Sequence, residues 1–170
     1  MLRLTRLLLV SMLLFCCVGC DQIAKHVVRD ELTLGESHSY LNDTVRLTHA
    51  ENPGAFLSLG DSLPKSLRTV FFQGGVGLIV IALLWVAAFA RDVDRWQIVA
   101  LSLLAAGGLG NLIDRVLYDG RVTDFLNIGL GGLRTGIFNI ADLVEVIGVV
   151  VFAFALQSAA RSASAPERHQ

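Results

Sequence analysis

Four long apolar segments constrain this chain more than any other feature of its sequence. They cover residues 7–28, 70–90, 96–113 and 140–157. A bilayer core of ~30 Å is crossed by roughly 20 apolar residues in a helix, and each segment is close to that length. Of the 170 residues 54% are hydrophobic and only 17% are charged, whereas about 25% of a soluble domain is charged. The sequence therefore predicts an all-α membrane protein with four transmembrane helices.

The basic residues near the ends of these segments predict the orientation. Dense Lys and Arg in short loops favour the cytoplasmic side of a membrane, and long loops weigh less in this rule. We therefore expect both termini in the cytoplasm, and one four-helix membrane domain over residues 1–160 followed by a short polar tail at 161–170. Three short segments on the predicted inner side each hold two such residues, which are Arg3, Arg6, Arg91, Arg95, Arg161 and Arg168.

The outer segment between the first two helices has a β pattern. Residues 45–49 alternate between apolar and polar side chains, which is typical of a half-exposed strand. Asn42-Asp43 can turn this strand back onto residues 37–41, and Asn52-Pro53-Gly54 is a second turn signal. A small extracytoplasmic β element is therefore predicted between helices 1 and 2. In the second outer segment, residues 115–139, the sequence indicates a turn at 119–120 and a flexible glycine-rich stretch at 129–136.

Ionisable and amide side chains gather at one end of the predicted helices. A charged residue near the bilayer centre costs ~2.5 to 3.5 kcal/mol on insertion scales, so each one needs an explanation. Asp21 and Lys25, four residues apart, could simply neutralise each other, and Asp114 beside Arg115 could be a local ion pair. The polar residues that fall on the outer side at similar depth are Asp21, Lys25, Asn111, Asp114, Arg115, Asp124, Asn139 and Asp142.

Asp124 and Asp142 stand apart from this group because neither has an adjacent cation. Asp142 could serve only the start of the fourth helix, where Asp accepts bonds from free N–H groups. Alternatively, two carboxyl groups within hydrogen-bond reach share one proton, so that one acts as base on a water while the other polarises a carbonyl. Such a pair would hydrolyse an amide without a metal ion, a cofactor or a covalent intermediate. On these residues alone both interpretations stay open.

Several other functional classes lack their sequence signals. The net charge of −1 and the absence of a basic cluster argue against a nucleic-acid partner. The histidines show no His-x-x-x-His spacing, no Gly-x-Ser-x-Gly occurs, and the glycines of residues 107–110 lie inside a span, where helix packing explains them better than a phosphate loop. Cys16, Cys17 and Cys20 lie in one apolar segment and predict neither a disulfide framework nor a metal site.

Five sequence blocks resemble one known family. GGLGNLIDRV at 107–116, VTDF at 122–125 and FNIAD at 138–142 resemble the signature blocks of the lipoprotein signal peptidases, also called signal peptidase II. DQIAK at 21–25 and ENPGAFLSLG at 51–60 agree more weakly. The order and spacing fit across roughly residues 10 to 155, which is far more specific than any one block.

This resemblance implies an aspartic endopeptidase of the bacterial inner membrane, with its active site toward the periplasm. Such an enzyme removes the signal peptide from diacylglyceryl-modified prolipoproteins by cutting before the lipidated Cys. The resemblance implies no metal and no cofactor, contact with membrane lipids, inhibition by globomycin, and catalytic roles for Asp124 and Asp142. We expect a monomer. The supporting or substrate-binding residues that it implies are Asp21, Lys25, Asn52, Gly54, Asn111, Asp114, Arg115 and Asn139.

The individual roles within this set are hypotheses. Asn111 and Asn139 are expected to orient the two aspartates or the scissile region, and Arg115 with Asp114 to hold the adjacent loop. The sequence departs from the family pattern at residues 52–58, where Asn-Pro-Gly-Ala-Phe-Leu-Ser replaces Asn-x-Gly-Ala-Ala-Phe-Ser, and at Leu143, where a small residue is usual. Neither departure touches an aspartate, but the edge of the pocket could differ.

Two alternatives belong to other classes. Residues 17–20, Cys-Val-Gly-Cys, followed by Asp21, are similar to the processing site of a lipoprotein precursor, in which Cys20 would become the new N-terminus. The three later spans argue against this alternative. The chain could also be a non-enzymatic membrane subunit or a small transporter that uses its polar residues as an ion path. The gathering of those residues on one side argues against a route through the midplane.

Overall fold

Each apolar segment forms a helix that is long and apolar enough to cross a membrane, so the predicted four spans are confirmed. The computed structural model describes residues 2–54 and 62–163. The first span is α1 (Arg3–Glu31). The second is one continuous helix made of α2 (Lys65–Arg68), the π-helical η2 (Thr69–Gly75) and α3 (Val76–Phe89). The third and fourth are α4 (Arg95–Leu117) and α5 (Ile140–Ala163). Several ends extend beyond the apolar runs, because polar end residues continue the helix outside the apolar core.

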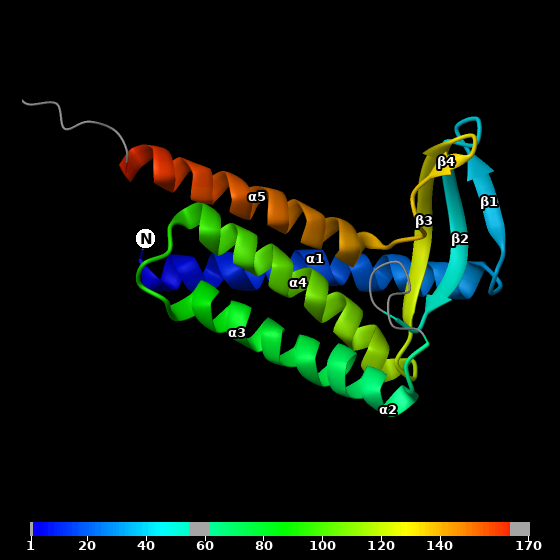
Figure 1. The fold of residues 1–170 in the computed structure, drawn as a ribbon, viewed down its shortest axis with the longest axis horizontal. Helices are drawn as coiled ribbons and strands as arrows, with labels where there is room; N and C mark the ends of the chain where they lie inside the picture. The colour runs from blue at the N-terminus through cyan, green and yellow to red at the C-terminus, as the bar shows by residue number, and fades with distance from the viewer. Residues whose placement is uncertain (1, 55–61, 164–170) are drawn as a thin grey trace, which may run out of the picture.

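A four-stranded antiparallel sheet covers one end of the helices (Figure 1). Its order is β1 (Ser37–Tyr40), β2 (Val45–Asn52), β3 (Val122–Leu130) and β4 (Leu133–Arg134). The predicted β element between helices 1 and 2 is confirmed: β1 and β2 pair from Ser37↔Thr48 to Tyr40↔Val45. Residues 41–43 turn the hairpin with φ of 53°, 51° and 65°, a left-handed conformation that Asn and Asp tolerate best.

The second outer segment contributes more structure than its sequence indicated. β3 is a nine-residue strand that pairs with β2 from Val45↔Ile128 to Asn52↔Val122. The four residues 122–125 are all buried, because both faces of the strand are covered at this point. A strand of this kind has no alternation of polar and apolar residues, so its pattern carries no strand signal. The predicted turn at 119–120 is present, with φ of 55° at Asp119 and 84° at Gly120.

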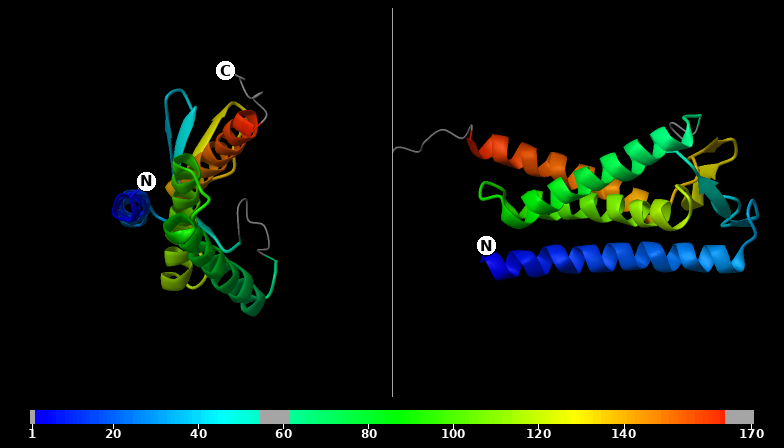
Figure 2. Two further views of the ribbon diagram at one scale, coloured as in Figure 1. Left: turned by 90° about the vertical axis from the view of Figure 1, so that its left-hand side faces the viewer. Right: turned by 90° about the horizontal axis from the view of Figure 1, so that it is seen from below.

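α4 is the central helix of the bundle and lies between α3 and α5, with α1 alongside it (Figures 1 and 2). Its apolar window is 56% buried, against 11% in α1 and in the second span. The glycines of α4 explain its close packing on α5, because a Cβ on Gly107 would lie 2.6 Å from the carbonyl oxygen of Ala141. Helix packing therefore accounts for this glycine cluster.

The two ends of the bundle differ in composition. The N-terminus, the α3–α4 turn and the end of α5 lie together at the end opposite the sheet (Figures 1 and 2). At the sheet end, β3 runs directly past the ends of α1, α4 and α5 (Figure 1). This end holds all ten residues that the sequence analysis selected for the site.

Candidate active site at the sheet end

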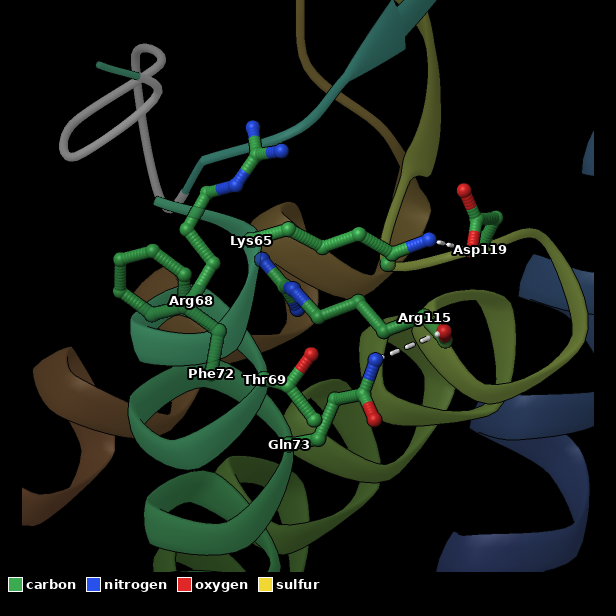
Figure 3. A pocket seen from close by; sticks show the side chains of 8 residues that line it. Lys65, Arg68, Thr69, Phe72, Gln73, Arg115 and Asp119 are labelled. Carbon is green, nitrogen blue, oxygen red and sulfur yellow. Dashed lines mark hydrogen bonds and ion pairs between the residues drawn. The ribbon is translucent and has the colours of Figure 1, made fainter. Parts of the chain in front are cut away.

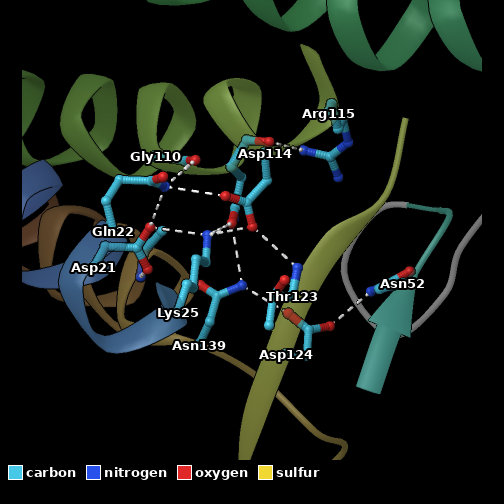
Figure 4. Close-up of polar contacts among 12 residues, drawn as sticks. Asp21, Gln22, Lys25, Asn52, Gly110, Asp114, Arg115, Thr123, Asp124 and Asn139 are labelled. Carbon is cyan, nitrogen blue, oxygen red and sulfur yellow. Dashed lines mark hydrogen bonds and ion pairs between the residues drawn. The ribbon is translucent and has the colours of Figure 1, made fainter. Parts of the chain in front are cut away.

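A buried lysine organises the first half of this site (Figure 4). Lys25 on α1 is fully buried, and its Nζ lies 2.8 Å from Oδ2 of Asp21 and 3.3 Å from Oδ2 of Asp114. The same nitrogen donates to Oδ1 of Asn111 at 2.9 Å. We call Lys25, Asp21 and Asp114 the Lys25 cluster. The predicted pairing of Asp21 with Lys25 is therefore confirmed.

The predicted ion pair between Asp114 and Arg115 is wrong. Consecutive residues on a helix do not face each other, and Asp114 points toward α1, where Lys25 and Arg29 are its cations, Arg29 at 3.8 Å. Arg115 instead donates to two backbone carbonyls, that of Asn111 at 3.3 Å and that of Gly54 at 2.8 Å. The two neighbours thus serve different parts of the site.

Three residues that the sequence analysis did not select complete the cluster. Gln22 donates to the carbonyl of Gly110 at 3.0 Å and to Oδ1 of Asp114 at 3.1 Å. The backbone N–H of Thr123 donates to Oδ2 of Asp114 at 3.0 Å, and Arg29 donates to the Thr123 hydroxyl at 2.8 Å. Arg29 could have been found from its position four residues after Lys25, which puts both on one helical face.

The two aspartates of the second half come from different elements. Asp124 lies on β3 and is 4% exposed; its Oδ1 accepts from the Asn139 side chain at 2.6 Å and its Oδ2 from the Asn52 side chain at 2.9 Å. Asp142 lies on the first turn of α5; its Oδ1 accepts from the Asn111 side chain at 2.9 Å and its Oδ2 from the Asn139 backbone N–H at 3.0 Å. Neutral amides of three asparagines thus hold all four carboxyl oxygens. We call Asp124 and Asp142 the aspartate pair.

Asn139 connects the two aspartates and also begins α5. Its Oδ1 accepts from the N–H of Asp142 at 3.0 Å, while Asp142 accepts from the N–H of Asn139. This reciprocal arrangement of the N-cap and the third helical residue is a capping box. The helix-start interpretation of Asp142 is therefore correct, and the same side chain also faces the group of asparagines around Asp124.

The pKa of Asp124 differs from that of an ordinary surface carboxyl group. Asp124 lies on the sheet, outside the membrane spans. Burial raises the pKa of Asp124 to about 6, and the negative charge of Asp142 adds to this rise. The bonds from Asn52 and Asn139 stabilise the charged form and oppose the shift in pKa. Asp124 therefore takes up a proton far more readily than a free carboxyl, and the charge on Asp142 is one of the causes.

The turn after β2 is held against this pair. The N–H of Gly54 donates to Oδ1 of Asn52 at 2.9 Å, which leaves the Asn52 amide free to donate to Asp124. Arg115, 7% exposed, fixes the Gly54 carbonyl, and its buried Nε has no hydrogen-bond partner among residues 2–54 and 62–163. Arg115 also lines a pocket of about 10 Å³ with Lys65, Phe72 and Gln73 (Figure 3), which is room for one water.

Of the two departures from the family pattern, only Leu143 can be placed relative to the site. Residues 55–58 lie outside the described residues. Leu143 directly follows Asp142 and is 45% exposed, so it lies on the outer face of α5. All ten predicted site residues are described, and hydrogen bonds and ion pairs join them into one continuous network around Asn111 and Asn139.

Glu145 on α5 is a further carboxyl, and the sequence analysis gave it no role. It follows Asp142 by three residues on the same face of α5, and it packs into the space that Gly107 leaves, where a Cβ would lie 2.4 Å from its Cγ. It makes no hydrogen bond or ion pair within the part of the chain that the structure describes. The i, i+3 spacing from Asp142 was the signal that could have placed it beside the pair.

The fold is that of a class of bacterial membrane enzymes. A solved bacterial membrane enzyme superimposes with a TM-score of 0.77 at 30% sequence identity, covering 98% of this chain and 94% of that one. A second, also described as a bacterial membrane enzyme, has a TM-score of 0.72 at 33% identity, with 89% and 92% covered.

The sequence defines the family within this class. Residues 13–157 match the family described as Signal peptidase (SPase) II. The lipoprotein signal peptidase of Desulforapulum autotrophicum is 35% identical over 151 residues, covering 89% of this chain and 91% of the relative. That of Streptococcus pneumoniae is 30% identical over 148 residues, with 87% and 92% covered. The chain belongs to the signal peptidase II family, which confirms the resemblance and makes it a multi-span membrane protease.

Proposed function

We propose that this chain is an aspartic endopeptidase that removes the signal peptide from diacylglyceryl-modified prolipoproteins and cuts before the lipidated Cys. Its family membership and the names of its relatives support the substrate class. The observation that carries the aspartic mechanism is the position of Asn139, which donates to both Asp124 and Asp142. One residue thereby holds two carboxyl groups from different elements at one place.

The raised pKa of Asp124 supports this residue as the carrier of the shared proton. Asp142 then takes a proton from a water molecule, whose oxygen forms a bond to the scissile carbonyl carbon. Asp124 donates its proton to the carbonyl oxygen at the same time. In the second step the C–N bond breaks, the proton on Asp142 moves to the leaving amine, and Asp124 regains its proton as the new carboxyl group forms.

The other predicted residues support this reaction by positioning. Lys25 holds the Asn111 oxygen, so that the Asn111 amide points to Asp142. Arg115 holds the Gly54 carbonyl and with it the turn that presents Asn52 to Asp124. Asp114 accepts a hydrogen bond from the Thr123 N–H and so fixes the residue of β3 that precedes Asp124. The ten residues act as one assembly in this proposal, without a metal ion.

The site lies at the sheet end, which we place on the periplasmic side of the inner membrane, with both termini in the cytoplasm. This placement puts the aspartates near the outer leaflet, where a lipid-bearing substrate would present its cleavage site. We further propose that residues 1–160 act as one domain and as a monomer in contact with membrane lipids, and that globomycin blocks the site.

The test is cleavage of a diacylglyceryl-modified prolipoprotein by the detergent-purified full chain. Asp124→Asn and Asp142→Asn should each lower the rate by about 10³-fold, since proton transfer by a positioned group contributes ~10² to 10⁴. Asp30→Asn removes an exposed carboxylate of α1 and should leave the rate unchanged. Wild-type cleavage should survive EDTA and stop with globomycin. Full cleavage by Asp124→Asn or Asp142→Asn would refute the catalytic role of the aspartate pair. These two residues would then have a non-enzymatic role in the membrane.

The lipoprotein-precursor alternative has its own test. A cut before Cys20 would separate residues 3–19 from the rest of α1, which the structure shows as one continuous helix. The intact mass of the purified protein should therefore correspond to the chain without cleavage at this point. A mass that begins at Cys20 with added lipid would overturn the proposed first span.

A further inference from the structure

A second polar cavity lies at the end of the bundle opposite the sheet, far from the aspartates. It has a volume of about 520 Å³ and is lined by Arg3, Arg6, Ala88, Phe89, Ala90 and Arg91. These residues come from the start of α1 and the end of α3, which lie at the same end of the bundle in Figure 1. Three guanidinium groups and three apolar side chains therefore surround one space, and no carboxylate of the described residues lines it.

Arg6 forms the fixed wall of this cavity. Its three guanidinium nitrogens donate to the backbone carbonyls of Val86 at 2.8 Å, Ala87 at 2.6 Å and Ala90 at 2.6 Å. These carbonyls lie at the C-terminal end of α3, where most backbone acceptors lack a partner within the helix, although that of Val86 also accepts from the Ala90 N–H. Hydrogen bonds to carbonyls do not neutralise the positive charge of Arg6. The cavity therefore keeps a fixed cation beside the two helix ends.

Arg3 and Arg91 add charge that has no counter-ion in the described parts of the chain. The guanidinium of Arg3 lies over the Phe89 ring, 5.6 Å from its centroid, and makes no ion pair with a described residue. Arg91 follows the last residues of α3 and is exposed. Of the two nearby carboxylates, Asp94 is used by the capping box that starts α4, and the exposed Asp92 makes no ion pair with another described residue. Three positive charges therefore face one cavity without a neutralising carboxylate.

We propose that this cavity binds the phosphate headgroup of an anionic phospholipid. The three arginines match a phosphodiester, to which guanidinium groups bind strongly. The half-exposed Phe89 and its alanine neighbours offer an apolar wall where the acyl chains leave the headgroup. Both helices that form the cavity end at the membrane surface, and basic pockets between transmembrane helices are known to take such headgroups. A free phosphate ion would not use the apolar wall.

The test is native mass spectrometry of the full chain in neutral detergent, titrated with phosphatidylglycerol or with phosphatidylcholine of the same acyl chains. We expect a one-lipid complex with phosphatidylglycerol that phosphatidylcholine does not form at the same concentration. One basic residue near an anionic lipid contributes on the order of fivefold in affinity. The double variant Arg3→Gln/Arg91→Gln should therefore bind phosphatidylglycerol about 25-fold more weakly.

The matched control is Arg95→Gln/Arg161→Gln, which removes two exposed arginines from the same end without touching the cavity. It should bind phosphatidylglycerol like the wild type. Equal weakening by both double variants would show a general surface charge and overturn the site, as would equal binding of the two lipids. Without added lipid, all variants should unfold at nearly the same temperature, since Arg6 keeps its contacts with the end of α3. Prolipoprotein cleavage should also be the same for all variants. The outcome is independent of the proposed peptidase reaction.

Discussion

The Lys25 cluster and the aspartate pair lie side by side and share Asn111, yet they hold their carboxyl groups in opposite ways. Asp21 and Asp114 accept bonds from a fully buried ammonium group. Among residues 2–54 and 62–163, Asp124 and Asp142 accept side-chain and backbone bonds from neutral amides alone. Burial raises the pKa of Asp124 to about 6, so this carboxyl can exchange a proton, whereas Asp21 and Asp114 are bound directly by a cation. The difference separates the part that holds the bundle together from the part that can do proton chemistry.

The largest expected effect comes from removing the cation. Lys25→Met leaves Asp21 and Asp114 buried with only Arg29 nearby, and loss of one partner of a buried ion pair costs about 3 to 5 kcal/mol. Thermal unfolding in detergent should show a large drop in Tm. Lys65→Met, which breaks the exposed pair with Asp119, should change stability by less than about 1 kcal/mol. Recovery of Tm in Lys25→Met/Asp21→Asn/Asp114→Asn would confirm uncompensated charge as the cause.

A smaller effect is the pH dependence of stability that we expect from the aspartate pair. The pKa of Asp124 is raised to about 6, so the folded chain binds this proton more tightly than the unfolded chain, whose Asp has a pKa of about 3.9. Its contribution is fully present below about pH 4 and is lost as the pH rises through about 6, a change of about 3 kcal/mol. Unfolding of wild type and Asp124→Asn should be compared from pH 4 to 7. A difference between them that stays constant over this range would contradict the shift.

The smallest effect concerns the double role of Asp142. Asp142→Ala removes the acceptor for the Asn139 N–H and so half of the capping box, which should cost about 1 kcal/mol of stability. Leu143→Ala, on the exposed side of the same turn, should cost less than about 0.5 kcal/mol. Circular dichroism on heating would measure both. Equal stability of Asp142→Ala and the wild type would mean that the capping box contributes nothing.

The features that could be predicted from the sequence are those that follow from a regular spacing of residues. The four spans followed from their length, the β1–β2 hairpin from alternation, and the Asp21–Lys25 pair from its i, i+4 spacing. The Asp114–Arg115 pair was predicted wrongly because adjacency along a helix is not adjacency in space. β3 was missed because its buried first half does not alternate. The contacts of Asn139 with both aspartates depend on the placement of α5 against β3, which no local pattern contains.

The place of α5 at the end of the chain has a consequence for biosynthesis. Membrane segments are made from the N-terminus onward, and Asp21, Lys25 and Asp114 have all been made once α4 is complete. Asp142 and Asn139 arrive only with the last helix. A nascent chain could therefore form its buried charge pairs early and still carry no complete pair of aspartates. Under the proposed mechanism, proteolytic capability would begin only when the final segment is in the bilayer.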